Sequence, residues 1–353
     1  MYRHTYAKIN VNNIKENVSK IINKYNNYDY YFGVVKAFCY GHDLLECVKA
    51  IIDGGCNYLA VATLDEAVEV RESFSEIPIL CLGYVDKEYT EVAAKNNITL
   101  TVNTLESAKE IVESNEKVKV HIKVNTGMNR LGMSKKEEIE EVYKLLIDNN
   151  IEVEGIYSHI YEASNKEKTF NQFNKFKELV NENIINNIKI VHIGASETTT
   201  LYEKLPFVNG CRLGIIMYGF TEDKTLNLQS TFSLYSKVIQ INELEKDDTV
   251  GYNGVYKATN NEKIAVIAIG YADGIIRENK GRKVYINNKE YEIVGNICMD
   301  MLFAKVDDSV KVGDEVSILK DIKHIEEVAH HLNSIPYEVL CTVSKRVPRI
   351  IEK

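Results

Sequence analysis

The alternation of short apolar runs with longer amphipathic stretches between about residues 28 and 220 constrains the fold more than any other feature of this chain. The amphipathic stretches place their apolar residues at helical spacing, whereas the apolar runs are rich in Val and Ile and predict strands. Strands that are apolar on both faces are typical of a parallel sheet covered by helices. Eight such strands with helical crossovers favour a closed (β/α)8 barrel of the TIM type over an open doubly wound sheet. The eight runs are YYFGVVK (30–36), YLAVAT (58–63), IPILCLG (77–83), ITLTVN (98–103), VKVHIKVN (118–125), IEVEGIYSHI (151–160), IKIVHIGA (188–195) and FVNGCRLG (207–214).

The pattern changes after about residue 225, where strand-like runs follow one another through turns. Within KVYINNKEYEIVG, the pair Asn287-Asn288 predicts a tight hairpin. One helical pattern, IEEVAHHL, interrupts these strands. A chain of 353 residues is also too long for one ordinary core. We therefore predict a barrel over residues 1–225 and a mainly β domain over 226–353, with a first strand at about 5–10 that could pair with the β domain.

The charge balance, the cysteines and the lack of long apolar segments limit the partners and the location to be expected for this protein. The 43 basic and 51 acidic residues give a formal net charge of -8, and no Lys/Arg-rich block stands out, so we expect no binding to nucleic acid. The seven cysteines are scattered and never form a Cys-x-x-Cys pair, which is typical of reduced intracellular thiols. The N-terminal segment lacks the apolar run of a signal peptide, and no stretch reaches the length of a membrane span. We expect a cytoplasmic protein with no membrane association.

Polar residues with useful chemistry lie where the predicted barrel strands end. In barrels of this kind functional groups gather at that mouth. Each residue alone would more often be an ordinary ion-paired or hydrogen-bonded side chain, but five at five strand ends indicate a site. A lysine that is desolvated at such a position can lose its charge, which frees its amine to condense with an aldehyde. The five residues are Lys36, Lys123, His159, Ser196 and Arg212.

Several motifs give the chain a resemblance to a known family. VVKAFCYGHD (34–43) resembles the cofactor-lysine motif of the alanine racemase family, and further segments resemble other motifs of that family in the same order. The resemblance implies a pyridoxal 5'-phosphate enzyme that interconverts L- and D-alanine, with D-alanine supplied for peptidoglycan. The further segments are KVNTGMNRLGM (123–133), GIYSHI (155–160), CRLGIIMYG (211–219), VGYN (250–253), IGYADG (269–274) and IVGNICMD (293–300).

The resemblance also implies roles for the catalytic residues. Lys36 would hold the cofactor as an aldimine and serve as one of two acid–bases, and Tyr252 would be the other, on the opposite face of the substrate. His159, hydrogen-bonded towards Tyr252, and Arg212 would adjust the acidity of that phenol. Arg212 would face the pyridine nitrogen, and His192 would support Arg212. A cation opposite that nitrogen limits how much charge the ring draws in, which suits a racemase.

Binding residues follow in the same way. The cofactor phosphate would lie against Tyr40, Ser196 and the backbone of Gly214 and Ile215, where amides can approach an anion. Arg130 would border the cofactor site.

The substrate carboxylate would be held by Arg130 and the backbone amide of Met299, and Tyr271 would line the entrance. Lys123 matches a lysine that is carbamylated in some members of the family and hydrogen-bonds Arg130. The alternative for Lys123 is a plain ion pair.

The chain departs from the family at several positions, and Lys345 is the most consequential. That position is commonly a tyrosine whose hydroxyl reaches the phosphate and whose ring crowds the substrate side chain. A lysine could bind phosphate as a point charge but would not form the same wall. This favours an alternative: a serine-preferring or broad-specificity racemase. The other departures are Phe38, Cys39, Asp43, Asn125 and Ala195.

Two other classes of function fit the sequence less well than the racemase does. A decarboxylase of related architecture would need a carboxylate opposite the pyridine nitrogen, where Arg212 stands, and a catalytic cysteine, for which Cys298 and Cys341 are candidates. A non-catalytic pyridoxal phosphate carrier would resemble the barrel alone. We expect no metal site, because the adjacent His330 and His331 point in different directions on a helix. The resemblance further implies a head-to-tail homodimer in which Tyr252 completes the partner's site.

Overall fold

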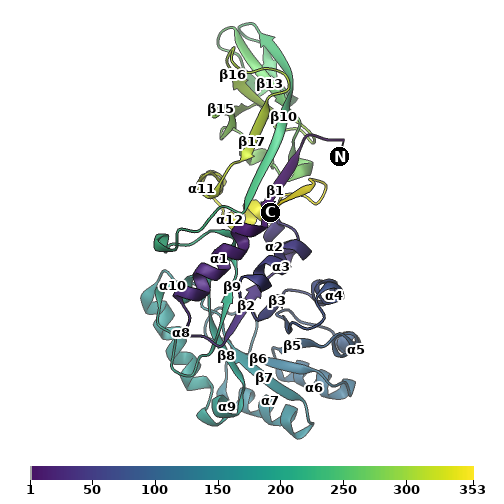
Figure 1. Cartoon of the computed structure of the whole chain (residues 1–353), viewed down its shortest axis with the longest axis vertical. Helices are drawn as coiled ribbons and strands as arrows, with labels where there is room; N and C mark the ends of the chain where they lie inside the picture. Colours follow the sequence, from purple (N-terminus) through teal and green to yellow (C-terminus); the bar gives the residue numbers. More distant parts are fainter. Residues whose placement is uncertain (1) are drawn as a thin grey trace.

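Residues 2–353 are described by a computed structural model, which has a helix-wrapped barrel at one end and a β domain at the other (Figure 1). All eight predicted barrel strands are present, and they close into a parallel barrel in sequence order. The predicted (β/α)8 architecture is confirmed. The barrel strands are β2 (Tyr30–Val34), β3 (Tyr58–Val61), β4 (Ile79–Cys81), β5 (Ile98–Val102), β6 (Lys119–Lys123), β7 (Glu152–Tyr157), β8 (Ile190–Ala195) and β9 (Gly210–Leu213).

Helices cover the outer face of the barrel, and local sequence explains where they begin. Thr63 and Thr104 cap the helices that follow β3 and β5, because each threonine side chain accepts a hydrogen bond from the backbone three residues on. The helix after β6 turns Ile139, Val142 and Leu146 toward the strands. The barrel helices are α3 (Leu45–Asp53), α4 (Leu64–Ser73), α5 (Thr90–Lys95), α6 (Leu105–Ser114), α7 (Lys136–Asp148), α8 (Lys166–Leu179), α9 (Glu182–Asn187) and α10 (Ser196–Leu201).

The β domain is built on an eight-stranded sheet with strand order β13-β16-β15-β14-β17-β10-β1-β18. The long strand β10 pairs with β1, β13 and β17 and so ties the sheet together. The predicted hairpin is present: β14 and β15 pair antiparallel across Asn287 and Asn288, both with positive φ. The strands are β10 (Phe232–Leu244), β13 (Glu262–Ile267), β14 (Lys283–Ile286), β15 (Lys289–Val294), β16 (Leu302–Val306) and β17 (Glu315–Leu319).

Two helices accompany this sheet where the sequence predicted one. The predicted helix is α11 (Ile322–His331), and the unpredicted α12 (Pro336–Cys341) begins with a proline in its first turn. Proline is favoured at that position because its missing N–H would have no partner there. Six residues are too few for a clear helical period, which explains why the sequence did not show α12.

The first strand, β1 (Tyr6–Asn10), belongs to the sheet of the β domain. It pairs antiparallel with β10 and parallel with the last strand, β18 (Arg349–Glu352). Helix α1 (Val11–Lys24) then leads from this sheet to the barrel (Figure 1). Within residues 2–353, no helix combines the length and the apolar character needed to cross a membrane.

Candidate active site

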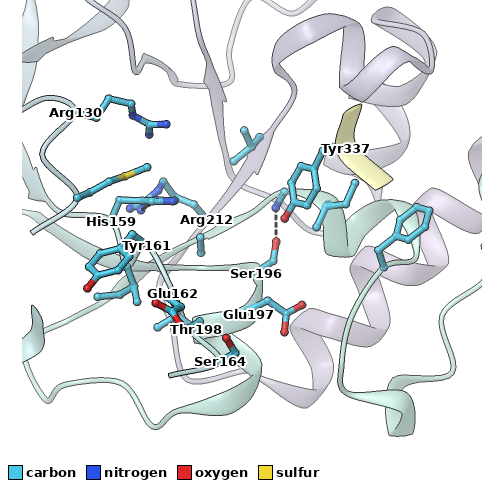
Figure 2. Close-up of a pocket in the computed structure, with 18 of the residues that line it drawn as sticks. Arg130, His159, Tyr161, Glu162, Ser164, Ser196, Glu197, Thr198, Arg212 and Tyr337 are labelled. Atoms are coloured by element: carbon cyan, nitrogen blue, oxygen red, sulfur yellow. Dashed lines mark hydrogen bonds between the residues drawn. The ribbon is translucent and has the colours of Figure 1, made fainter. Parts of the chain in front are cut away.

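A cavity of about 810 Å³ opens at the mouth of the barrel, where the carboxyl ends of the strands meet. It brings together the five strand-end residues: Lys36, Lys123, His159, Ser196 and Arg212. Figure 2 shows Arg130, His159 and Arg212 on one side of this cavity, with Ser196 and Tyr337 on the other. Four further residues implied by the family resemblance also line it: Tyr40, Arg130, Gly214 and Ile215.

Lys36 is presented by an unusual backbone segment. The four residues after it, from Ala37 to Tyr40, all have φ between 50° and 57°, so they form a left-handed helical turn. Each such residue costs about 1–2 kcal/mol. Burial of Cys39 and Tyr40 and a 2.7 Å hydrogen bond from the Ala37 amide to Glu66 hold this turn in place. Strain of this kind is typical of functional sites.

The chemical state of Lys36 suits an amine that must react. Burial, reinforced by the positive charge of Arg130, lowers the pKa of Lys36 below its ordinary value. A larger fraction of the side chain is therefore neutral near pH 7 than for an exposed lysine.

Arg212 lies buried between two histidines. Its Nη1 donates to His192 Nδ1 at 2.8 Å, and its Nη2 donates to His159 Nδ1 at 3.1 Å and to the Ser158 carbonyl at 2.8 Å. A guanidinium can only donate, so Nδ1 of both histidines must be an acceptor. Burial lowers the pKa of Arg212 to about 10, which leaves it a cation at neutral pH. Burial and the charge of Arg212 lower the pKa of His159 to about 2, so His159 is neutral with its proton on Nε2.

A cradle for an anion lies beside this pair. The Gly214 amide donates to Ser196 Oγ at 3.0 Å, the dashed line in Figure 2. A Cβ on residue 214 would lie 2.8 Å from Tyr40 Oη and 3.6 Å from Ser196 Oγ, so only glycine leaves this space open. Because the Gly214 amide donates its one hydrogen to Ser196 Oγ, the Ser196 hydroxyl keeps its own hydrogen for a ligand, and this hydroxyl and that of Tyr40 beside a glycine fit a phosphate group. Together with the amine of Lys36 in the same cavity, this cradle fits pyridoxal phosphate.

Lys123 does not form the plain ion pair that was one expectation for it. It is only 8% exposed, and within residues 2–353 no carboxylate lies within 4 Å of its amine. Its Nζ instead lies 4.1 Å from the centre of the Tyr157 ring. Burial, with the charges of Arg212 and Arg130, lowers the pKa of Lys123 well below its ordinary value.

Asn125, where the family usually has aspartate, organises the loop that carries Arg130. Its side-chain oxygen accepts from the amides of Gly127 at 3.1 Å and Asn129 at 3.0 Å, and its nitrogen donates to Ser134 at 2.9 Å. A carboxylate could make the first two bonds but could not donate the third. The substitution is therefore compatible with the same loop.

Tyr252 and Met299 do not reach this cavity within the same chain. They line a separate depression on the β domain, together with Cys298, Asp300 and Met301. Tyr252 is 71% exposed and Met299 is 53% exposed. The hydrogen bond between His159 and Tyr252 that the resemblance implies is not made within one chain.

Tyr271 and Lys345 also lie outside the set of residues that line the cavity. The Tyr271 amide donates to the Cys298 carbonyl at 3.0 Å, which places it beside the second depression. The ammonium of Lys345 lies 4.7 Å from the centre of the Phe38 ring, which is an interaction of a cation with an aromatic face.

Tyr337 is a lining residue that the sequence did not reveal. It sits in the first turn of α12, its ring lies 5.8 Å from that of Tyr40, and burial raises its pKa to about 12. The only local signal was Pro336, which marks a helix start. Within the described chain, no three His, Cys, Asp or Glu side chains are grouped in a way that could hold a metal ion.

Comparison with known proteins agrees with this arrangement. The chain matches the family models described as alanine racemase, N-terminal domain (residues 9–222) and alanine racemase, C-terminal domain (residues 231–351). It is 36% identical over 364 residues to alanine racemase 1 of Bacillus subtilis, covering 99% of this chain and 93% of that one. It is 37% identical over 375 residues to the alanine racemase of Clostridium tetani, covering 99% and 96%.

A solved structure gives the same result for the fold. The crystal structure of alanine racemase from Bacillus anthracis with bound L-Ala-P superimposes with a TM-score of 0.92 at 32% identity, and the match covers 100% of this chain and 96% of that one. Relatives above 30% identity and two family models that together span both domains establish the relationship. The chain belongs to the alanine racemase family.

Proposed function

We propose that this protein is a pyridoxal phosphate-dependent racemase that interconverts L- and D-alanine. The family relationship supports the reaction class, and one observation carries the proposal for this chain: a cavity that holds a desolvated lysine, an anion cradle and a buried cation together. A carboxylate in place of Arg212 would have favoured the decarboxylase. The direct contacts of Arg212 are instead histidines and backbone carbonyls.

The residues that would hold the cofactor follow from the fit described above. Lys36 would bind it covalently through its amine, the cradle at Ser196, Gly214, Ile215 and Tyr40 would receive its phosphate, and Arg212 would face its pyridine nitrogen. When bound, pyridoxal phosphate withdraws electrons from the substrate Cα and makes the hydrogen there acidic.

Two acid–base groups on opposite faces of the substrate are then needed, because racemisation removes a proton from one face and delivers one to the other. The Lys36 amine would move the proton on one face. The Tyr252 hydroxyl of a second chain would move it on the other, with the Nε2–H of His159 available as a donor towards that phenol. Arg130 and the backbone amide of Met299 would hold the substrate carboxylate, and Tyr271 would line the approach.

Because Lys36 and Tyr252 would come from different chains, we propose that the protein is a homodimer. The exposed depression at Tyr252 and Met299 and the cavity at Lys36 are separate in one chain. A head-to-tail pair would bring each depression to the partner's cavity and complete two equivalent sites.

Lys123 would be carbamylated in this scheme. A buried neutral amine adds to CO2, forms an N–C bond and releases one proton, which leaves an anionic carbamate. That anion would offset the charges of Arg130 and Arg212 and orient Arg130, a role that the unpaired amine cannot perform.

The preferred amino acid is a separate question. Because Lys345 does not wall the cavity as a tyrosine would, a serine-preferring or broad-specificity racemase is the second candidate. We propose cytoplasmic action and delivery of D-alanine to peptidoglycan as the physiological setting.

To test the racemase proposal, the purified protein is incubated with pyridoxal phosphate and single L-amino acids in deuterated water. Loss of the α-proton signal and appearance of the D-enantiomer are expected, fastest with alanine. A protein that binds the cofactor at Lys36 but exchanges no α-proton would instead be a carrier, and the racemase proposal would fail.

A further inference from the structure

A column of polar side chains runs from Arg212 down the inside of the barrel, away from the cavity. His192, on β8, accepts from Arg212 through Nδ1, and its Nε2 lies 2.9 Å from Nδ1 of His121, on β6. The other nitrogen of His121, Nε2, lies 3.5 Å from the Oε2 atom of Glu154, on β7. All four side chains are buried, and no residue beyond Arg212 in this column lines the cavity.

The direction of every hydrogen bond in the column follows from Arg212. Since a guanidinium has no acceptor, Nδ1 of His192 is unprotonated and the proton of that neutral ring is on Nε2. That Nε2–H can only donate to Nδ1 of His121, so His121 carries its own proton on Nε2. Burial lowers the pKa of both histidines, which keeps both rings neutral. Nε2 of His121 therefore carries a proton beside Glu154, whose Oε2 lies 3.5 Å away, and this nitrogen makes no hydrogen bond in the described chain.

The two rings are held so that they cannot reorient. The His192 ring is stacked between Tyr157, at 4.6 Å, and Phe32, at 4.5 Å, with interplanar angles of 8° and 16°. The His121 ring fits over Gly155, where a Cβ would come within 2.5–2.8 Å of three of its atoms. This packing restrains each ring to its plane. A 180° flip within that plane would exchange ring nitrogens for carbons and break the hydrogen bonds.

The surroundings of Glu154 keep its carboxyl group ionised at the far end of the column. Burial alone would raise its pKa, but the nearby His121 ring, a hydrogen bond from Tyr58 and the charge of Lys119 outweigh burial and lower the pKa to about 2. Tyr58 donates to Oε2 at 2.8 Å, and the amines of Lys119 and Lys189 lie 3.4 and 3.5 Å from Oε1. A buried carboxylate is expensive unless it is paired in this way.

We propose that Glu154 is a positioning residue for the reaction, acting through His121 and His192 on Arg212. Its carboxylate lies 3.5 Å from the protonated Nε2 of His121 and so favours, from the closed end of the barrel, the same tautomers that Arg212 sets from the cavity. A carboxylate that accepts from one imidazole nitrogen makes the other a stronger acceptor. Acting through the rings of His121 and His192, the Glu154 carboxylate holds the Arg212 guanidinium in one orientation. It also provides a counter-charge to Arg212 although no carboxylate lies in the site.

The tautomers give a direct test that needs no turnover. The holoenzyme is labelled with nitrogen-15 in its histidines, and the ring signals of His121 and His192 are assigned in the wild type. We expect an unprotonated Nδ1 and a protonated Nε2 on both rings at neutral and alkaline pH. A protonated Nδ1 on either ring would overturn the proposal. This readout tests the order of protons along the column and needs no variant at position 154.

The second arm compares Glu154→Gln with Glu152→Gln, a control on the same strand. Glu152 is exposed and approaches Lys119 at 3.7 Å, but it has no contact with His121. In Glu154→Gln we expect changed nitrogen signals at His192 and a kcat for alanine lowered about 10–100-fold, the size of a lost interaction with a charged group. The KM should change little, because residue 154 does not touch the substrate.

Two results would contradict the proposal: Glu154→Gln indistinguishable from Glu152→Gln in both measurements, or a loss confined to KM. Tyr58→Phe, which removes one donor to Glu154, should shift the same signals by less. The kinetic arm rests on the racemase function proposed above. If the wild type racemises no amino acid, that function fails, while the nitrogen signals still decide whether the column exists.

Discussion

The separation of Tyr252 from the cavity at Lys36 leads to a quantitative prediction for mixed subunits. Lys36→Ala and Tyr252→Ala should each be inactive alone, since each removes one acid–base from every site. Mixed in equal amounts with free exchange, about half of the dimers contain one chain of each kind, and one of their two sites is intact. The mixture should therefore recover about one quarter of wild-type activity.

Both variants are expected to fold. Tyr252 is 71% exposed, and surface truncations away from special features usually change stability by less than about 0.5 kcal/mol. Lys36 is partly buried, and its removal relieves the desolvation of an amine. The assay follows D-alanine formation after mixing, while differently tagged chains report exchange by co-purification. Proven exchange with no recovery would place Lys36 and Tyr252 in the site of a single chain and refute the shared site.

Three more predictions concern the cavity. Gly214→Ala should weaken pyridoxal phosphate binding roughly 10–100-fold, because overpacking against a buried hydroxyl costs about 1–3 kcal/mol. Cofactor titration measures this affinity. The control is Gly194→Ala, whose Cβ would meet only ordinary contacts at 3.5–3.6 Å and which should bind the cofactor normally. Intact-protein mass spectrometry or carbon-13 NMR with labelled bicarbonate should detect a carbamate on Lys123. The carbamate should be lost as pH falls, because protonation of the Lys123 amine, whose pKa is lowered, reverses its addition to CO2. A Lys123→Met variant that still shows the signal would place the carbamate elsewhere. Lys345→Tyr should lower the serine-to-alanine ratio of kcat/KM by roughly tenfold; an unchanged ratio would mean that position 345 does not set specificity.

The barrel could be predicted because its signal is physical and repeated. Strands such as Ile98–Val102 are buried at every position, and only a covered parallel sheet explains eight such runs in sequence with helical stretches between most of them. The same logic located Lys36, Lys123, His159, Ser196 and Arg212, because a residue that ends a barrel strand must face the mouth.

What the sequence did not show depends on contacts between distant segments. His121 and Glu154 lie within runs that read as apolar strands, and their partnership needs the register of neighbouring strands. The single clue was that a buried His and a buried Glu each need a partner. Tyr337 was missed because a helix of six residues has almost no pattern. The position of Lys345 over Phe38 depends on how the C-terminal segment packs against the left-handed turn.

The place of β1 has a consequence for how the chain is made. Its residues Ala7 and Ile9 are fully buried only when β10 and β18 lie beside them, and the partner of Tyr6 follows about 230 residues later. At a ribosomal rate of about 5–20 residues per second, the first strand waits roughly 10–50 s for β10, and it waits longer still for β18. The barrel strands are consecutive and can associate meanwhile. A chain that stalls before β18 would therefore present a formed cofactor cavity beside an incomplete sheet, with the unpaired edge of β1 open to aggregation.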